Sequence, residues 1–208
     1  MRLFNCQHCD QVLYFENTKC ERCGHRLGYL PDDNTLSALE PEGDAWQALA
    51  VPGSPYRFCA NAAYDACNWL VPTGSPGDYC TACRHNRMVP DLSVPANVAA
   101  WRKIELAKHR LFYSLLRLRL PLRTRAEDPE HGLAFDFLAD PPPDATGPKV
   151  MTGHDNGLIT LALHLIMEST HPLVASPVVR TLLTSLPSEV LPQLLVGAVL
   201  AVIGYSLN

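Results

Sequence analysis

The eight cysteines of this chain all lie within its first 83 residues. They form two sets of four, Cys6, Cys9, Cys20 and Cys23, and then Cys59, Cys67, Cys80 and Cys83. Three of the four pairs have the spacing Cys-x2-Cys, which lets two thiolates reach one ion from a single tight turn at Zn–S distances of about 2.3 Å. Four thiolates complete the tetrahedral coordination of zinc. The spacing therefore predicts two structural Zn²⁺ ions with no open coordination position.

A disulfide scaffold is the alternative explanation for so many cysteines, and it is typical of small secreted domains. The N-terminal sequence MRLFNCQHCD lacks a charged start followed by an apolar run, so we expect no signal peptide, a cytoplasmic location and reduced thiols. A redox CxxC motif would occur once beside a βαβ pattern, whereas here the motif is repeated in loop-rich sequence. We therefore predict zinc ligands rather than disulfides.

The ligand pairs could follow sequence order or interleave, as they do in RING-type domains. Because 35 residues separate Cys23 from Cys59, an interleaved pair would have to order that whole segment, and we expect two local sites. Gly24 supports this expectation, since glycine accepts the positive φ of a turn beneath the metal. Three histidines beside the cysteines could replace a thiol, but four thiols per set favour supporting or surface roles for them: His8, His25 and His85.

Length and charge limit the remaining architecture. The 208 residues can hold one ordinary domain plus small metal modules, and the net charge of -4 gives no general case for nucleic-acid binding. Residues 1–90 contain few periodic apolar runs, as expected where metal substitutes for a core, and short strands are predicted at 12–15, 57–59 and 68–71. We predict an α+β protein with a first zinc ribbon (1–35), a second zinc ribbon (36–92), the start of a further domain (93–160) and an apolar tail (161–208).

One long amphipathic helix is predicted from Pro95 to about Leu118. Ser93 is placed to cap it and Pro121 ends the pattern. Apolar residues at helical spacing should form its buried stripe: Trp101, Ile104, Leu111, Phe112, Leu115 and Leu118. Through Arg125 the segment carries eight basic residues against one acid, Glu105. Such a face can bind membranes or nucleic acid, but no aromatic residue is interleaved on it, so we interpret it as a solvated face.

Residues 126–160 predict a short strand pair. Residues 133–138 alternate and form one strand, and GLIT from Gly157 begins the other, with a rigid loop of three prolines between them. The turn at residues 154–157 places His, Asp and Asn next to one another just before a predicted strand. We expect a structural role for it through hydrogen bonds to the backbone.

The sequence resembles a known family, the bacterial zinc-ribbon-containing putative zinc-binding metallopeptidases, over about residues 1–160. The resemblance rests on RLFNCQHCDQVLYFENTKCERCGHRLGYLPD, YRFCANAAYDACNWLVP with YCTACRHNRMVPDLS, WRKIELAKHRLFYSLLRLRLPL, and RAEDPEHGLAFDFLAD with GPKVMTGHDNGLIT. It implies that a zinc-ribbon region precedes a zinc-dependent peptidase domain, which would begin within residues 93–160. It also implies that the eight cysteines are structural zinc ligands and that GLIT begins the strand bordering the substrate cleft.

The chain departs from that family after Thr160. The family continues with an acid-rich stretch and a helix bearing HExxH, whose two histidines hold a catalytic zinc and whose glutamate is the general base. This sequence contains no HExxH, and its last 48 residues hold three charged side chains against 35 in the preceding 160. We therefore expect a rearranged, fused or truncated gene product, with no catalytic residue assigned and no peptidase activity as the chain stands.

A substitute site in the tail is one alternative. His164, Glu168 and His171 fall at i, i+4 and i+7, so a helix would align them on one face, and carboxylate and imidazole are adequate zinc ligands. Pro172 argues against this site because it disfavours helical geometry at His171.

Residues 190–207 suggest a second interpretation of the tail, as a segment that associates with a membrane. Eighteen residues span about 27 Å as a helix, near the lower limit for a bilayer, and no basic residue lies close enough to orient them. Burial against the long helix, or an aggregation-prone end, explains them equally well. Weak membrane association is therefore an alternative to the cytoplasmic location.

Taken together, these observations predict structural zinc binding in a catalytically incompetent relative of a zinc metallopeptidase. Two other functions stay open. One is an active zinc-dependent peptidase with an unconventional site, and the other is a zinc-ribbon protein-interaction module with a membrane-associating tail.

Overall fold

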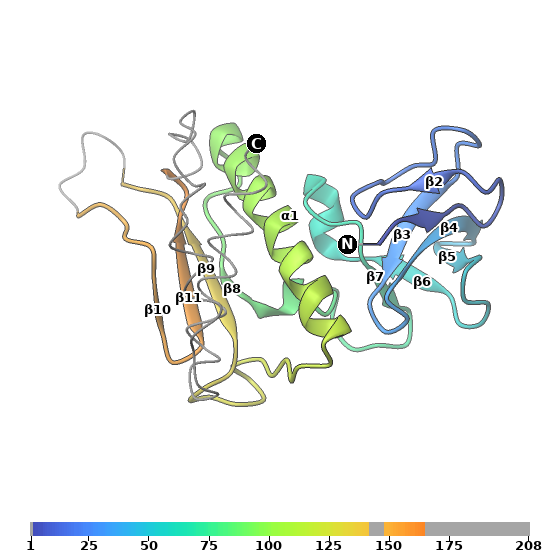
Figure 1. Cartoon of the computed structure of the whole chain (residues 1–208). Helices are drawn as coiled ribbons and strands as arrows, with labels where there is room; N and C mark the ends of the chain where they lie inside the picture. Colours follow the sequence, from blue (N-terminus) through green and yellow to red (C-terminus); the bar gives the residue numbers. More distant parts are fainter. Residues whose placement is uncertain (1, 142–147, 165–208) are drawn as a thin grey trace. The chain divides into compact units, whose positions relative to one another are not determined.

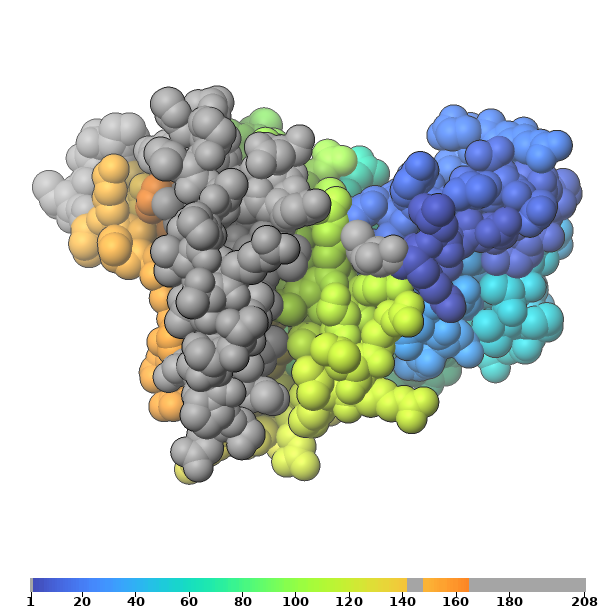
Figure 2. All heavy atoms as spheres, viewed as in Figure 1, coloured from blue at the N-terminus to red at the C-terminus, as the bar shows by residue number. Residues whose placement is uncertain are grey.

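The computed structural model describes residues 2–141 and 148–164 (Figure 1). Two compact units are present: residues up to 84 together with 112–120, and residues 85–111 together with the described residues from 121 onward. The atoms of residues up to 84, blue and cyan in Figure 2, form one continuous mass. Helix and sheet are both present, as the predicted α+β class requires.

The first unit is built on antiparallel strands. Strand β1 (Phe4–Asn5) pairs with β2 (Val12–Leu13). A second sheet has the order β3 (Arg26–Leu30), β4 (Thr35–Glu42), β5 (Ala45–Ala48), β6 (Tyr56–Phe58) and β7 (Leu70–Pro72). Strands β2, β6 and β7 lie near the predicted strands, whereas β3, β4 and β5 were not predicted. The sheet runs through both segments predicted as ribbons, and their division at residue 35 stays a prediction.

The two edge strands of the five-stranded sheet meet. An isolated bridge pairs Tyr29 of β3 with Trp69 beside β7, and the Tyr29 N–H donates to the carbonyl of Asn68 at 2.9 Å. Both aromatic side chains are fully buried, with ring centroids 4.7 Å apart, and Phe15 packs edge-on against each of them. The expectation that metal replaces a core in residues 1–90 is therefore wrong, because these sparsely spaced apolar residues converge in three dimensions.

The strands of the second unit are linked by a β-α-β crossover, whose helix belongs to this unit up to Leu111. Strand β8 (Asn86–Met88) leads through α1 (Pro95–Arg117) to β9 (Ala134–Leu138), which lies parallel to β8 and to β11 (Leu158–Ala162). Strand β10 (Gly153–Asp155) completes the sheet antiparallel to β11, in the order β10-β11-β9-β8. The predicted strand pair is thus present as β9 and β11. Short 3₁₀ helices lie at Ala60–Tyr64 (η1) and Cys83–His85 (η2).

A tight hairpin turn joins β10 to β11. Asn156 and Gly157 both have positive φ, 42° and 88°, as in a type I′ turn. A side chain at Gly157 would place its Cβ 2.5 Å from the carbonyl oxygen of His131. The predicted structural role of this turn is therefore one of backbone geometry, which Asn-Gly supplies.

The ends of α1 differ from the sequence-based expectation. Val94 precedes the helix, and the hydroxyl of Ser93 donates to the carboxylate of Asp91 at 2.7 Å, so Ser93 is not the cap. Leu118 is 68% exposed instead of buried, because it lies beyond the last helical residue, where Arg119 turns the chain with φ 54°. The other five residues of the predicted stripe are buried. No helix among the described residues is long and apolar enough to cross a membrane, and residues 190–207 lie outside them.

The basic face of α1 is not uniformly solvated. Lys108 is 2% exposed, and its ammonium group lies 2.8 Å from the carboxylate of Glu105, which is fully buried. Asn86 joins the pair by donating to Glu105 and accepting from Lys108. The Lys108 ammonium also lies over the rings of Phe135 and Phe137, at 5.7 and 5.5 Å from their centroids. This lysine belongs to the interior because a carboxylate, an amide and two aromatic faces satisfy its charge.

Breaking this ion pair should destabilise the protein. Lys108→Met leaves the Glu105 carboxylate buried without its ammonium partner, so we expect the free energy of unfolding to fall by about 3–5 kcal/mol. Lys103→Met, at an exposed position of the same helix, should change it by less than about 0.5 kcal/mol. The double variant Glu105→Leu/Lys108→Met should recover much of the loss. Denaturant unfolding measures all three, and equal effects of Lys108→Met and Lys103→Met would contradict the buried pair.

Candidate metal centres

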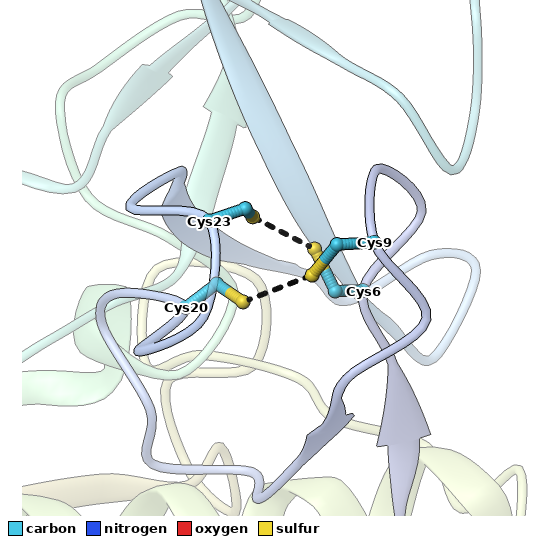
Figure 3. A group of neighbouring side chains, drawn as sticks. All are labelled: Cys6, Cys9, Cys20 and Cys23. Atoms are coloured by element: carbon cyan, nitrogen blue, oxygen red, sulfur yellow. Dashed lines mark hydrogen bonds between the residues drawn. The ribbon is translucent and has the colours of Figure 1, made fainter.

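The first cluster brings together Cys6, Cys9, Cys20 and Cys23, which point toward a common centre in Figure 3. The Sγ atoms of Cys6 and Cys23 are 3.6 Å apart, as are those of Cys9 and Cys20. Two thiols come from the turn between β1 and β2, and two from the turn before β3. The four ligand atoms lie within 4.8 Å of one another.

The two turns of this cluster have matching hydrogen bonds. In the first, the Asp10 N–H donates to the carbonyl of Cys6 at 2.8 Å; in the second, Gly24 donates to Cys20 at the same distance. Asp10 and Gly24 both have positive φ, 60° and 79°. The turn predicted from Gly24 is therefore present twice, with an aspartate at the other position, a residue that tolerates left-handed backbone better than most.

The second cluster brings together Cys59, Cys67, Cys80 and Cys83, all buried. The wide interval between its first two cysteines is occupied by η1, which returns the chain to the site. Backbone N–H groups approach the sulfurs: Trp69 donates to Cys67 at 3.3 Å, and Cys83 donates to Cys80 at 3.4 Å. Such donors favour the thiolate form that a metal requires.

The sulfur spacing fits zinc. A tetrahedral ion with Zn–S bonds of about 2.3 Å separates its sulfurs by about 3.8 Å. The Sγ atoms of Cys67 and Cys80 are 3.7 Å apart, close to the 3.6 Å of the first cluster, and all eight cysteines are free thiols. A disulfide would need about 2.05 Å. The first cluster contains the first four cysteines of the chain and the second cluster contains the last four. The ligand pairs are therefore not interleaved.

The three histidines beside the cysteines have different surroundings. The buried His85 ring forms a 2.9 Å hydrogen bond through Nδ1 with the carbonyl of Leu133. The rings of His8 and His25 stack with centroids 4.1 Å apart, and Nε2 of His25 lies 4.0 Å from the carboxylate of Glu40. The sequence pattern gave no sign of this imidazole pair, because its members lie in different turns.

The substitute site predicted in the tail can be described at one residue. His164 lies beside β11, with Nδ1 3.1 Å from Oδ2 of Asp140, and the other oxygen of Asp140 accepts from the N–H of Val150 at 2.8 Å. Glu168 and His171 lie outside the described residues. Asp140 was not predicted, because its approach to His164 depends on the parallel pairing of β9 with β11.

Two sulfur clusters of zinc size, followed by a β-α-β unit, define a zinc-ribbon protein that continues into another domain. Residues 3–94 match the zinc-ribbon domain family, and residues 97–172 match the family described as "putative zinc-binding metallo-peptidase". These two matches support the resemblance seen in its sequence. Together with the clusters, they identify Zn²⁺ as its cofactor, with two ions per chain.

Mycobacterial proteins are similar to this chain. The "uncharacterized protein" Mb2598c of Mycobacterium bovis and Rv2568c of Mycobacterium tuberculosis are each 37% identical to it over 163 residues, 78% of this chain. That match spans 43% of each relative, so the chain covers less than half of their length. No solved structure matches the chain.

Removing one cysteine should release one zinc. Cys20→Ser opens the first cluster and leaves the second intact, so we expect the number of tightly bound zinc ions to fall from two per chain to one, measured by mass spectrometry of the native protein. Cys80→Ser should do the same at the second cluster. Loss of both ions from either variant would show that the sites are not independent.

Zinc uptake by the second cluster should release protons. Burial raises the pKa of Cys67 well above its ordinary value, so the metal-free thiol is protonated at pH 7 and must ionise to bind zinc. Affinity should therefore fall as pH falls. The Cys20→Ser/His8→Ala/His25→Ala protein isolates this cluster, because it also lacks the imidazoles beside the first one, and calorimetry in buffers of different ionisation enthalpy counts the protons. Uptake without proton release would contradict a buried protonated thiol.

Proposed function

We propose that the eight cysteines hold two structural zinc ions and that the chain, as it stands, is a catalytically incompetent member of its peptidase family. In this proposal two ribbons, residues 1–35 and 36–92, precede the start of a peptidase-like domain at 93–160. The observation that carries the proposal is the closure of each cluster by four sulfurs. Coordination by four thiolates leaves no position for a water or a substrate.

Hydrolysis by zinc needs a different arrangement. A catalytic zinc has three protein ligands and a bound water, with a general base nearby to accept its proton. Neither sulfur cluster offers that water position, and the sequence lacks HExxH, the motif that would supply two imidazole ligands and the base on one helix. The two zinc ions of these clusters therefore stabilise the ribbons and do not catalyse hydrolysis.

The Asp140 and His164 pair favours the second candidate, a peptidase with an unconventional site. A carboxylate that holds Nδ1 of an imidazole leaves Nε2 directed elsewhere, where it can bind a metal or accept a proton. The pair also lies past the carboxyl ends of the parallel strands β9 and β11, where open α/β sheets place their ligands. The third candidate, an interaction module with a membrane-associating tail, concerns residues outside the described part of the chain.

An activity measurement separates the first two candidates. We expect the zinc-loaded chain to hydrolyse an unfolded protein substrate such as reduced casein no faster than buffer with zinc alone. Chelator-sensitive hydrolysis that is lost in His164→Ala and kept in His154→Ala, an exposed histidine of β10, would overturn the proposal. It would assign catalysis to the Asp140 and His164 pair.

A further inference from the structure

The edge of the first cluster carries a second set of metal donors. One ligand atom from each of His8, Cys23 and His25 lies within 4.8 Å of the others. Cys23 belongs to the first sulfur cluster as well, so the two donor sets share this sulfur. His8 is exposed, while Cys23 and His25 are half-buried. A metal ion can reach these donors from solvent, unlike the fully buried second cluster.

Local backbone geometry builds this arrangement. His8 lies inside the turn between Cys6 and Cys9, and His25 follows Gly24 in the matching turn. The carbonyl of His25 accepts from the N–H of Cys20 at 2.9 Å, which fixes the backbone of His25 beside the cluster. The positive φ of Gly24, 79°, turns the chain between Cys23 and His25. The stacked rings thus reach the same edge of the cluster from two turns that zinc holds together.

The chemistry of these donors suits a transition-metal cation. Four thiolates give a zinc cluster a net charge of -2, and a zinc-bound thiolate keeps lone pairs that can bind a second ion. Two imidazoles and a thiolate are the ligand types that zinc prefers. The carboxylate of Glu40, 4.0 Å from Nε2 of His25, adds negative charge beside these donors.

We propose that a further, exchangeable zinc ion binds through His8, His25 and the bridging thiolate of Cys23, with Glu40 favouring the cation. This inference rests on the proposed function, since Cys23 is a ligand of the first structural zinc. The additional ion has two side-chain ligands of its own and one shared ligand, so it binds more weakly than the ions held by four thiolates. Its exposure allows it to exchange with zinc in solution.

The test uses the full chain loaded with its two structural zinc ions. Titration with zinc, followed by calorimetry, should show a third equivalent that a weak chelator removes while two ions remain. His8→Ala/His25→Ala should keep the two tight ions and lose the third. His131→Ala/His154→Ala, which removes two exposed histidines of the second unit, should keep all three. Glu40→Gln should weaken the third equivalent several-fold.

Binding of Co²⁺ at the additional site tests whether the thiolate of Cys23 bridges this ion and the first structural zinc. Co²⁺ added to the zinc-loaded chain should give sulfur-to-cobalt charge-transfer absorption in the near ultraviolet, and the His8→Ala/His25→Ala protein should not. A wild-type chain that binds two ions and no third, a third ion that survives the double variant, or cobalt bound without that absorption would each overturn the proposal. Fewer than two tight ions at the outset would instead overturn the structural sites, so the two failures are distinguishable.

Discussion

Coordination of one ion by four thiolates is the constraint on which the ribbon region depends. Each cluster joins separate segments of the chain: the first joins the turn after β1 to the turn before β3, and the second joins the end of β6 to residues 80–83. Cys59 directly follows β6, so the second zinc and the hydrogen bonds between β6 and β7 fix the same part of the chain. The metal sites and the five-stranded sheet therefore support each other, and neither is an appendage of the other.

Zinc binding and burial of the apolar core both contribute to the stability of the ribbon region, and their magnitudes differ. A structural zinc contributes an apparent free energy of about 10–16 kcal/mol at neutral pH, whereas the net stability of a whole domain is about 5–15 kcal/mol. The aromatic core around Tyr29 and Trp69 is real, but its burial must offset the conformational entropy of about 90 ordered residues. Removal of one ion therefore costs a free energy comparable with the net stability of the part of the chain that this ion closes. The core sets the shape of the ribbon region, and the metal makes that shape stable.

Features encoded by neighbouring residues were predictable from the sequence, and features that need long-range pairing were not. The cysteine clusters follow from CxxC spacing because each turn is local, and α1 follows from apolar periodicity over 23 residues. Strands β3 and β4 were not predicted because their buried residues follow one another and include Gly28 and Ser37, instead of alternating with exposed residues. The helix sequence predicts a solvated Lys108, because nothing in it indicates that the rings of Phe135 and Phe137 lie beside this side chain. The pairing of His8 with His25 likewise needs the two turns to be brought together by the metal.

Ligand type separates permanent metal from exchangeable metal in this chain. Thiolates alone surround the two structural positions, and a closed, largely buried set of sulfurs neither activates water nor releases its ion readily. Three imidazoles lie in more accessible places, those of His8 and His25 at the edge of a ribbon and that of His164 beside Asp140. Imidazole binds a metal in its neutral form, and protonation of the ring releases the metal. Sites with imidazole ligands therefore respond to metal supply and to pH. Metal exchange and proton transfer are therefore chemistry that these imidazoles can supply, whereas the four-thiolate positions themselves are closed.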